Sequence, residues 1–295
     1  MQTEITGSTV PRRQLGRYMR DLRGQARMTV RAVAKELEWS EGKIWRIETG
    51  KSSLRSHDAE LMCRVYGANV EMTGVLTALA KETKSRGWWH SYGDVIPEYF
   101  DVYIGLEESA SEFRWYEENL VPGLLQTRPY AQAIIESDNP EVGPTEIARR
   151  VGVRTGRGAL LTRATAPPRF QAVIGEAVLR SPVGGAETMH GQVEHLLKLA
   201  QLEHVQVRVM PFDAGLHTGL HSGSFITLGF PKTLDGHDSE PTTVYIESLT
   251  GALYLDRPAE LSRYNAVWEG LWGSCLDDLA SAELMRQAAR RFRDE

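Results

Sequence analysis

The chain has 295 residues, of which 41% are hydrophobic and 25% charged, and this composition excludes a mainly disordered protein because it provides enough apolar residues for a core. No apolar run reaches the roughly 20 residues that a membrane-spanning helix needs, and the first residues lack the apolar segment of a secretory signal. Two cysteines, Cys63 and Cys275, are too few for a disulfide framework or a cysteine-rich zinc site. We therefore expect a soluble, cytoplasmic protein of about two domains, with no membrane contact.

Charge is unevenly distributed along the chain, although the net charge is −5. Residues 1–86 contain 16 lysines and arginines against 10 acidic residues, whereas residues 87–295 contain 18 against 29. A basic segment followed by an acidic one suggests that the first segment meets an anionic polymer, although a solvated charged face also produces such an excess.

Apolar residues recur at helical spacing from residue 14 to residue 85 and predict five short helices. The predicted helix N-caps are Thr29, Ser40 and Ser56, and Gly50 is placed to end the third helix. The helical pattern stops at Gly87-Trp88-Trp89, so we predict a first domain over residues 1–86 and a second over residues 87–295.

The second domain mixes helical and strand-like patterns. We predict helices over residues 107–118, 129–136, 145–161, 187–202, 258–271 and 274–292, and strands over residues 170–178, 205–210, 224–229, 243–248 and 252–255. The first two strands flank a helix, which favours a parallel crossover, and the later strands resemble an antiparallel meander. Ser274 and Asp277 resemble a capping box for the last helix, and His217 to His221 fall in a glycine-rich loop.

The most informative stretch runs from Thr29 to Lys51. A helix, a short turn and a second helix pack there through Val33, Leu37, Ile44 and Ile47, which is the geometry of a helix-turn-helix. The fold class that we predict is an all-α five-helix helix-turn-helix domain followed by a larger α/β domain with a mixed sheet.

The second helix of this motif presents Glu41, Lys43 and Arg46 near its N-terminal end, where a recognition helix reads the major groove. Arg46 has the chemistry to pair with guanine, and the alternative is a salt bridge to Glu41 or Glu48. Lys43 has the reach for a base or a phosphate, and Glu41 either accepts from cytosine or stabilises the helix N-terminus. Glu48 fits a structural role inside its own domain. The predicted DNA-backbone contacts are Arg12, Arg13, Arg17, Arg31, Ser40, Lys51 and Arg55.

Ala34 followed by Ser40-x-x-x-Ile44-x-Arg46-Ile47-Glu48-x-Gly50-Lys51 resembles the phage-repressor and Cro-like helix-turn-helix class, often called XRE, over about residues 12–72. Gly42 departs from the polar residue that this class often has there and offers no side chain to a base. The resemblance implies a sequence-specific DNA-binding transcriptional regulator. One head covers little of the groove, so we expect a homodimer on two half-sites of double-stranded DNA.

The second domain also carries a family resemblance. The residues that carry it are Gly87-Trp88-Trp89, Phe113-x-x-x-Glu117-x-x-x-Val121-Pro122-Gly123-Leu124-Leu125-Gln126-Thr127, Gly175-Glu176-Ala177 and Tyr245-Ile246-Glu247. They resemble the domain of unknown function DUF5753 found in actinobacterial regulators of the WhiJ-like family, over about residues 87–275. The resemblance implies a regulator that is often encoded with a small partner protein of the BldB-like (DUF397) type, and it supplies no ligand.

Several polar and aromatic residues of the second domain are candidates for a ligand or partner site: Trp88, Trp89, Glu117, Gln126, Arg150, Arg154, Glu176, His217 and His221. For the polar residues, the alternative is a buried network that holds helices to the sheet. For the aromatic residues, the alternative is packing of the hinge onto the second domain. Arg149, Arg150, Arg154 and Arg157 form a basic stripe on one predicted helix.

The sequence carries no H-E-x-x-H, no glycine-rich phosphate loop and no G-x-S-x-G, so we expect no metal, no cofactor and no enzyme activity. The second domain is expected to modulate DNA binding through a small partner protein. A small-molecule sensor and an antitoxin-like member of a two-gene pair stay open as alternatives.

Overall fold

The computed structural model describes residues 9–50, 52–82, 98–232, 240–249 and 251–294, and these residues fall into two compact units. The first unit contains the described residues up to 82 together with residues 101–109 and Glu240. The second contains residues 98–100, 110–232 and the described residues from 241 onward. The domain boundary that we predict at residue 86 lies outside the described residues.

The first unit contains the five predicted helices, which is confirmed. They are α1 (Thr9–Gln25), α2 (Val30–Glu36), α3 (Glu41–Glu48), α4 (Ser56–Tyr66) and α5 (Val70–Glu82), and α6 (Glu98–Ser109) follows. The first five pack around one buried apolar cluster, in which Leu15 and Met19 of α1 meet Met62 of α4 and Leu76 of α5. Burial of this shared apolar stripe is what stabilises helices as short as these.

Two of the three predicted helix caps are confirmed. The Thr29 hydroxyl accepts a hydrogen bond from the Ala32 backbone N–H at the start of α2, and Ser40 accepts one from Lys43 at the start of α3. Gly50 follows the end of α3 with a φ of +69°, a conformation that favours glycine, as predicted. The prediction for Ser56 is wrong, because α4 begins at that residue and its capping position, Arg55, makes no side-chain cap.

The second unit is built on a mixed six-stranded sheet, which confirms the predicted fold class. Its strands are β1 (Glu112–Glu117), β2 (Arg169–Gly175), β3 (Val205–Met210), β4 (Phe225–Gly229), β5 (Thr243–Ser248) and β6 (Gly251–Leu255), in the order β3-β2-β1-β4-β5-β6. The pairs β1–β2 and β2–β3 are parallel, and β1–β4, β4–β5 and β5–β6 are antiparallel. Both the predicted parallel crossover and the predicted antiparallel meander are therefore confirmed.

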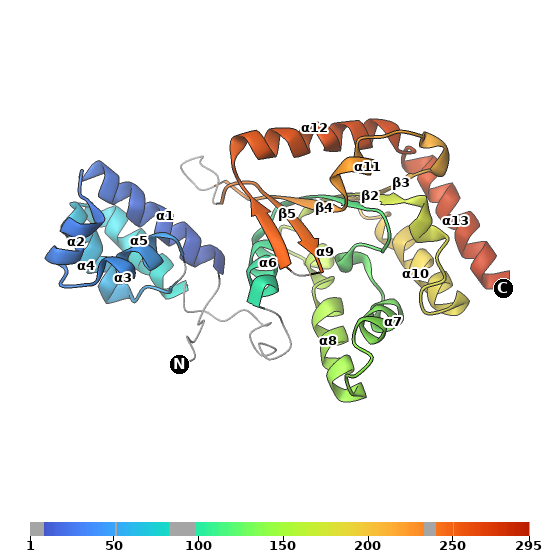
Figure 1. Cartoon of the computed structure of the whole chain (residues 1–295), viewed down its shortest axis with the longest axis horizontal. Helices are drawn as coiled ribbons and strands as arrows, with labels where there is room; N and C mark the ends of the chain where they lie inside the picture. Colours follow the sequence, from blue (N-terminus) through green and yellow to red (C-terminus); the bar gives the residue numbers. More distant parts are fainter. Residues whose placement is uncertain (1–8, 51, 83–97, 233–239, 250, 295) are drawn as a thin grey trace. The chain divides into compact units, whose positions relative to one another are not determined.

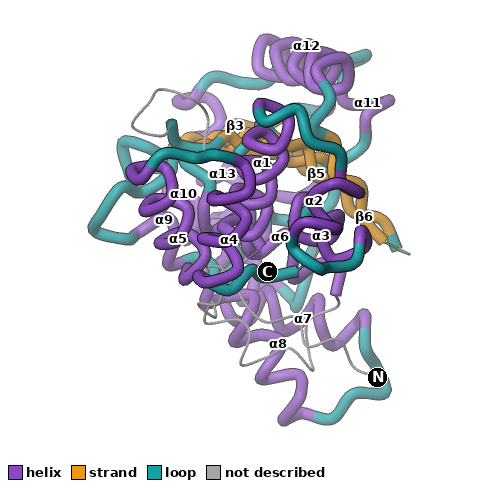
Figure 2. The backbone as a smooth tube through the Cα atoms, turned by 90° about the vertical axis from the view of Figure 1, so that its left-hand side faces the viewer, coloured by secondary structure: helices purple, strands orange, loops and turns teal. Residues whose placement is uncertain are grey.

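Helices cover both faces of this sheet (Figures 1 and 2). In both views α12 lies on one face and α7 and α8 lie on the other. The helices of this unit are α7 (Arg128–Asp138), α8 (Pro144–Gly156), α9 (Ala159–Thr162), α10 (Ala186–Leu199), α11 (Gly219–Ser222), α12 (Pro258–Ser274) and α13 (Asp278–Asp294). Trp268 and Leu271 of α12 share a buried cluster with Tyr116 of β1 and Phe225 of β4.

Residues 107–118 do not form the helix that we predict. The preceding helix α6 ends at Ser109, and residues 112–117 form β1, which hydrogen-bonds to β2 on one side and to β4 on the other. A central strand satisfies its backbone groups with two partners that lie far along the chain, and the local pattern does not report those partners.

Several other boundaries differ from the predictions, among them the ends of the helices predicted over residues 187–202 and 258–271, which lie at Leu199 and Ser274. The strand predicted over residues 170–178 ends at Gly175, and the helix predicted over 145–161 is interrupted between α8 and α9. The last helix begins at Asp278, because Asp277 caps it: an Asp277 carboxylate oxygen accepts from the Ala280 N–H at 2.8 Å, whereas Ser274 ends α12. The residues predicted as a loop at His217 to His221 overlap the single helical turn α11, which runs from Gly219 to Ser222.

Candidate nucleic-acid interface

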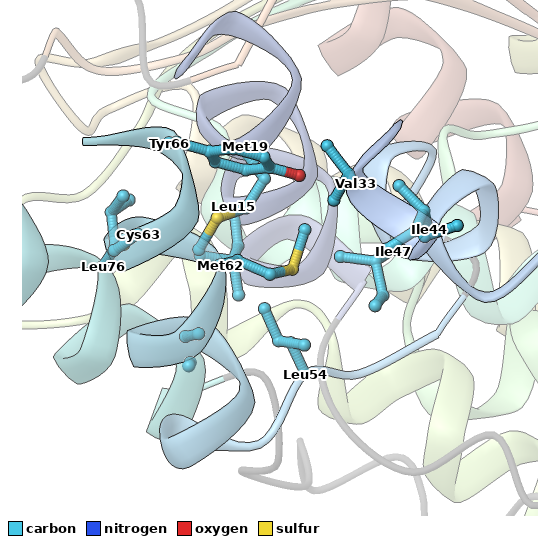
Figure 3. Close-up of a cluster of buried hydrophobic side chains, with 13 residues drawn as sticks. Leu15, Met19, Val33, Ile44, Ile47, Leu54, Met62, Cys63, Tyr66 and Leu76 are labelled. Carbon is cyan, nitrogen blue, oxygen red and sulfur yellow. The ribbon is translucent and has the colours of Figure 1, made fainter. Parts of the chain in front are cut away.

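Helices α2 and α3 form the two arms of the helix-turn-helix. Val33 of α2 and Ile44 and Ile47 of α3 are at most 2% exposed and lie side by side in the core (Figure 3). In the turn, the Trp39 N–H donates to the Ala34 carbonyl at 2.8 Å, and Glu38 takes a φ of +54°. This hydrogen bond ends α2 and redirects the chain into α3.

Helix α3 is anchored to α1 at its C-terminal end. The Arg23 Nε donates to one Glu48 carboxylate oxygen at 2.6 Å, and Arg23 Nη2 donates to the other at 2.9 Å. The hydrogen bonding that Arg23 donates to Glu48 is the main cause that raises the pKa of Arg23. At Gly16 of α1, an added Cβ would lie 2.4 Å from the Ile47 carbonyl oxygen, so the two helices touch there. The structural role expected of Glu48 therefore follows from a buried ion pair.

One face of α3 points outward, from its first turn at Glu41 to its last turn at Arg46. Glu41, Gly42 and Arg46 are exposed, and a Cβ added at Gly42 would meet no atom within 4 Å. Within the described part of the chain, the Arg46 side chain makes no hydrogen bond or ion pair, while Glu48, one of its predicted alternative partners, is bound by Arg23. The outward face of α3 thus carries an exposed guanidinium, and its first turn adds the positive end of the helix dipole, so both favour an anionic partner.

Lys43 is held inside its own domain. Its Nζ lies 3.2 Å from the centroid of the Trp39 ring and 3.4 Å from an Asp58 carboxylate oxygen. Both contacts stabilise the ammonium group where it is. A contact from Lys43 to a base or a phosphate would have to replace them.

The predicted DNA-backbone residues lie in different environments. Arg31 and Arg55 are exposed. Arg12 is only 5% exposed, so the structure does not present it at the surface, and Arg17 donates to Glu240 at 2.7 Å within the same compact unit. The Ser40 hydroxyl is engaged as the cap of α3. The side chain of Arg13 and the residue Lys51 lie outside the described part of the chain.

Sequence reasoning missed Arg23 and Gly16, the residues that fix the position of α3. A signal for Arg23 exists, because it follows Leu15 and Met19 at the same four-residue spacing and is therefore a charged residue on the apolar stripe of α1. No comparable local signal distinguishes Gly16 from Gly24 of the same helix, where an added Cβ would meet no atom within 4 Å.

In the second unit, strand alternation brings polar residues to one end of the sheet. Strands β1 and β5 both run antiparallel to β4, so they end at the same edge. Tyr116 of β1 and Val244 of β5 pack against α12 on one face of the sheet. Because side chains alternate along a strand, Glu117 of β1 and Tyr245 and Glu247 of β5 lie on the opposite face, which α7 and α8 cover. Ser224, just before β4, donates to Glu117 at 2.6 Å.

Helices α7 and α8 supply further polar residues at this edge of the sheet. Tyr130 of α7 accepts a hydrogen bond from the Val121 N–H at 3.1 Å, and Arg154 and Arg157 lie at the C-terminal end of α8. The pKa of Tyr130 is raised by burial and by Glu117, and lowered by Arg154, so its hydroxyl lies within the electrostatic reach of both. We call the following six residues the carboxyl-edge cluster: Glu117, Tyr130, Arg154, Arg157, Ser224 and Glu247.

Besides Tyr130, two carboxyl-edge residues have displaced pKa values. Burial raises the pKa of the Glu117 carboxyl, against the hydrogen bonds from Ser224 and Trp115 that favour its ionised form. Burial also lowers the pKa of Arg154, and the neighbouring Arg157 lowers it further. Gln126, another predicted candidate, lies next to the cluster, because its Nε2 donates at 2.7 Å to the carbonyl of Val121.

The other ligand candidates are not brought to this cluster. Arg150 pairs with Glu146 at 3.1 Å and also bonds Asn139. Glu176 accepts from the Phe212 N–H at 3.0 Å and pairs with Arg180 at 2.6 Å, which matches the alternative of a structural network. The remaining candidates are His217, which meets the edge of the Tyr116 ring, His221, which is exposed in α11, and Trp88 and Trp89, which lie outside the described residues.

Two features of the described residues bear on other kinds of site. No helix among them is both long enough and apolar enough to cross a membrane. In the same part of the chain, no three histidine, cysteine or acidic side chains come together as a group that could hold a metal ion.

Comparison with known families assigns both parts of the chain. A family model described as a helix-turn-helix domain matches residues 14–76, which contain α2 and α3. A model described as a domain of unknown function, DUF5753, matches residues 100–287. Comparisons with curated proteins and with solved structures give no match. Because the second model covers more than half of the sequence, the chain belongs to the DUF5753 family, with a helix-turn-helix domain ahead of the family domain.

Proposed function

We propose that this protein is a sequence-specific DNA-binding transcriptional regulator of the XRE kind, which reads an operator through the exposed face of α3. The helix-turn-helix domain indicates DNA binding, and the observation that supports sequence reading is the exposed Arg46. Arg46 makes no ion pair with a described residue and stands on a helix whose position is fixed by Arg23 and Glu48. A guanidinium that has no partner in the protein and stands on a helix held in place is suited to the two acceptors of guanine.

In this proposal Glu41 and Gly42 face the groove beside Arg46, and Arg31 and Arg55 contact the phosphates. Phosphate contacts position the domain without specifying sequence. Two copies on two half-sites would double both kinds of contact, so the active species is a homodimer.

The test is binding of the purified full chain to the DNA upstream of its own gene, with a scrambled duplex of the same composition as the control, across a series of salt concentrations. A dimer that engages about six phosphates gives a log–log salt slope of about −5 on both duplexes, and the operator is bound more tightly at every salt concentration. Equal affinity for the two duplexes, by a folded dimer, would contradict sequence-specific reading.

We further propose that the second unit modulates DNA binding. The resemblance to WhiJ-like regulators supports a small BldB-like (DUF397) protein as the modulator, and coexpression of the chain with the product of a small neighbouring gene tests it. Copurification of the two proteins at a fixed ratio, with a changed operator affinity, is the expected result. Without copurification, the proposal of a protein modulator fails.

A further inference from the structure

Strand β3 lies at one end of the strand order, so within the described part of the chain β2 is the strand that pairs with it. The two strands run parallel, and the Phe170 N–H of β2 donates to the carbonyl of His204. Because the backbone groups of successive residues point to opposite edges of a strand, every second residue after His204 also faces β2. Val205, Val207 and Val209 therefore direct their N–H and C=O groups to the outer edge of the sheet.

This outer edge is paired at one end and unpaired beside it. The Val209 N–H donates to the Ser281 hydroxyl at 3.0 Å, and the Val209 carbonyl accepts from the Leu276 N–H at 2.9 Å. For the outward N–H and C=O of Val207, no hydrogen-bond partner exists among the residues that the structure describes, although Val207 is only 3% exposed. Unpaired backbone groups at a buried edge position are costly, so this position favours a partner that offers both a donor and an acceptor.

A groove of about 490 Å³ lies along this unpaired part of the edge. Residues of β3 line it together with residues of α10 and α13, two helices that pack on each other (Figure 1). Its large apolar side chains are Leu197 of α10 and Leu279 and Met285 of α13. Leu279 is 82% exposed, so it becomes buried only when a partner covers it, and that burial favours binding.

The charge that the groove offers to a partner is negative. Of its charged side chains, Asp278 pairs with Arg208 at 2.6 Å and Arg286 pairs with Glu283 at 3.2 Å. Glu194 of α10 is exposed and makes no ion pair or hydrogen bond with a described residue. A basic side chain is the partner that complements this carboxylate.

We propose that an extended segment of a partner protein, with apolar and basic side chains, binds in this groove and adds a strand to the sheet beside β3. Its backbone pairs with Val207, an apolar side chain packs against Leu197 and Leu279, and a lysine or arginine pairs with Glu194. Strand addition of this kind takes its affinity from backbone hydrogen bonds and its specificity from the side-chain pockets.

The inference deepens the proposed function and rests on it, because it gives the protein modulator of the second unit a place to bind. The groove belongs wholly to the second unit. A test with a peptide therefore needs neither DNA nor the neighbouring gene, and the two proposals can fail separately.

The test measures binding of the capped synthetic pentapeptide Val-Lys-Val-Lys-Val to the full chain, together with hydrogen exchange. We expect the peptide to slow exchange in Val205–Met210, because it pairs with the Val207 N–H. Val-Glu-Val-Glu-Val should bind about tenfold more weakly, since it brings like charges to Glu194. The lysine peptide with every backbone nitrogen methylated keeps the side chains and loses the donors, so it should also bind about tenfold more weakly.

Two variants of groove residues, each with a matched control, locate the bound peptide. Glu194→Lys should weaken binding of the lysine peptide about threefold, whereas Glu187→Lys, on the same helix but not in the groove lining, should leave it nearly unchanged. Leu279→Lys should weaken it about tenfold, whereas Leu220→Lys, at an exposed leucine of α11, should not. All four residues are exposed, so the variants should fold like the wild type.

Three results would overturn the proposal: no slowing of exchange in Val205–Met210, equal binding of the methylated peptide, or equal effects of the groove variants and their controls. The product of the small neighbouring gene gives a separate test. If it copurifies with the wild type, Leu279→Lys should abolish copurification, and persistence would show that the modulator binds elsewhere. If it does not copurify with the wild type, the protein modulator fails, and the peptide result still decides the groove.

Discussion

The guanidinium of Arg23 on α1 holds both carboxylate oxygens of Glu48 on α3, at 2.6 and 2.9 Å, and its remaining nitrogen donates to the Met28 carbonyl at 2.9 Å. Glu48 is the last residue of the helix that carries Arg46. The ion pair therefore sets the orientation of the surface that we propose to read DNA, although neither residue faces that surface.

Replacing Glu48 should destabilise the head. Glu48→Gln keeps the shape but removes the charge that both Arg23 bonds use, and the expected loss of unfolding free energy is about 2 kcal/mol. The measurement is calorimetric unfolding of the full chain. Glu60→Gln is the control, because the exposed Glu60–Arg64 pair at 3.7 Å should contribute less than about 0.5 kcal/mol. Equal effects of the two variants would contradict a structural role for the Arg23–Glu48 pair.

Two glycines of α1 should respond in opposite directions to alanine. A Cβ at Gly16 would lie 2.4 Å from the Ile47 carbonyl oxygen, so Gly16→Ala must push α1 and α3 apart and should cost about 1–3 kcal/mol. Gly24 has open space around it, and Gly24→Ala should stabilise the helix by about 0.5–1 kcal/mol. Denaturant unfolding of both variants measures the difference, and a neutral Gly16→Ala would show that the helices do not touch as described.

Arg46 and Arg31 should differ in how they affect DNA binding. Arg46→Ala should lose about 1–3 kcal/mol of discrimination at one base position and leave folding nearly unchanged. Arg31→Ala should weaken binding equally on operator and scrambled DNA and make the salt slope shallower by about 0.9 for each phosphate that is no longer neutralised. Binding of both variants to a set of single-base operator changes separates the two effects. Full operator discrimination by Arg46→Ala would refute the assignment of the recognition helix.

The raised pKa of Glu117 predicts a pH dependence of stability. In the folded state burial disfavours the ionised carboxyl, so its contribution to stability is fully present below the ordinary carboxyl pKa and is lost as the pH rises through the folded-state pKa. Glu117→Gln should therefore be less sensitive than the wild type to pH over that range. Unfolding free energies measured from acid to neutral pH for both proteins test this.

Ser224→Ala provides the matching control for Glu117. The Ser224 hydroxyl donates to the Glu117 carboxylate and so favours its ionised form. Its removal should raise the pKa of Glu117 further and move the loss of stability to higher pH. A shift to lower pH would mean that the Ser224 hydroxyl does not stabilise the ionised Glu117 carboxyl.

Local signals predicted most of the first unit and the main contacts of its candidate site. Capping by Thr29 and Ser40, the glycine at position 50 and the apolar faces of α2 and α3 depend on residues within about one turn of each other. The exposure of Arg46 follows from the same periodicity. The engagement of Lys43 by Asp58 does not, because the two residues lie 15 positions apart on different helices.

The second unit shows where local patterns fail. The strands that alternate or contain β-branched residues were predicted close to their observed ends, as at Val205–Met210 and Thr243–Ser248. The segment Glu112–Glu117 is predicted as a helix but forms a strand. It is a strand because it hydrogen-bonds to β2 on one side and to β4 on the other, and the local pattern does not contain these partners.

The sequence by itself determined the two-part organisation, the helix-turn-helix and the residues on its outward surface, since periodicity, capping and charge act over a few residues. Only the tertiary structure decided that residues 112–117 form a central strand, that Arg23 pairs with Glu48, and that Ser224 donates a hydrogen bond to Glu117. These contacts join residues from different elements, and their free energy depends on burial and on partners that exist only once the elements pack.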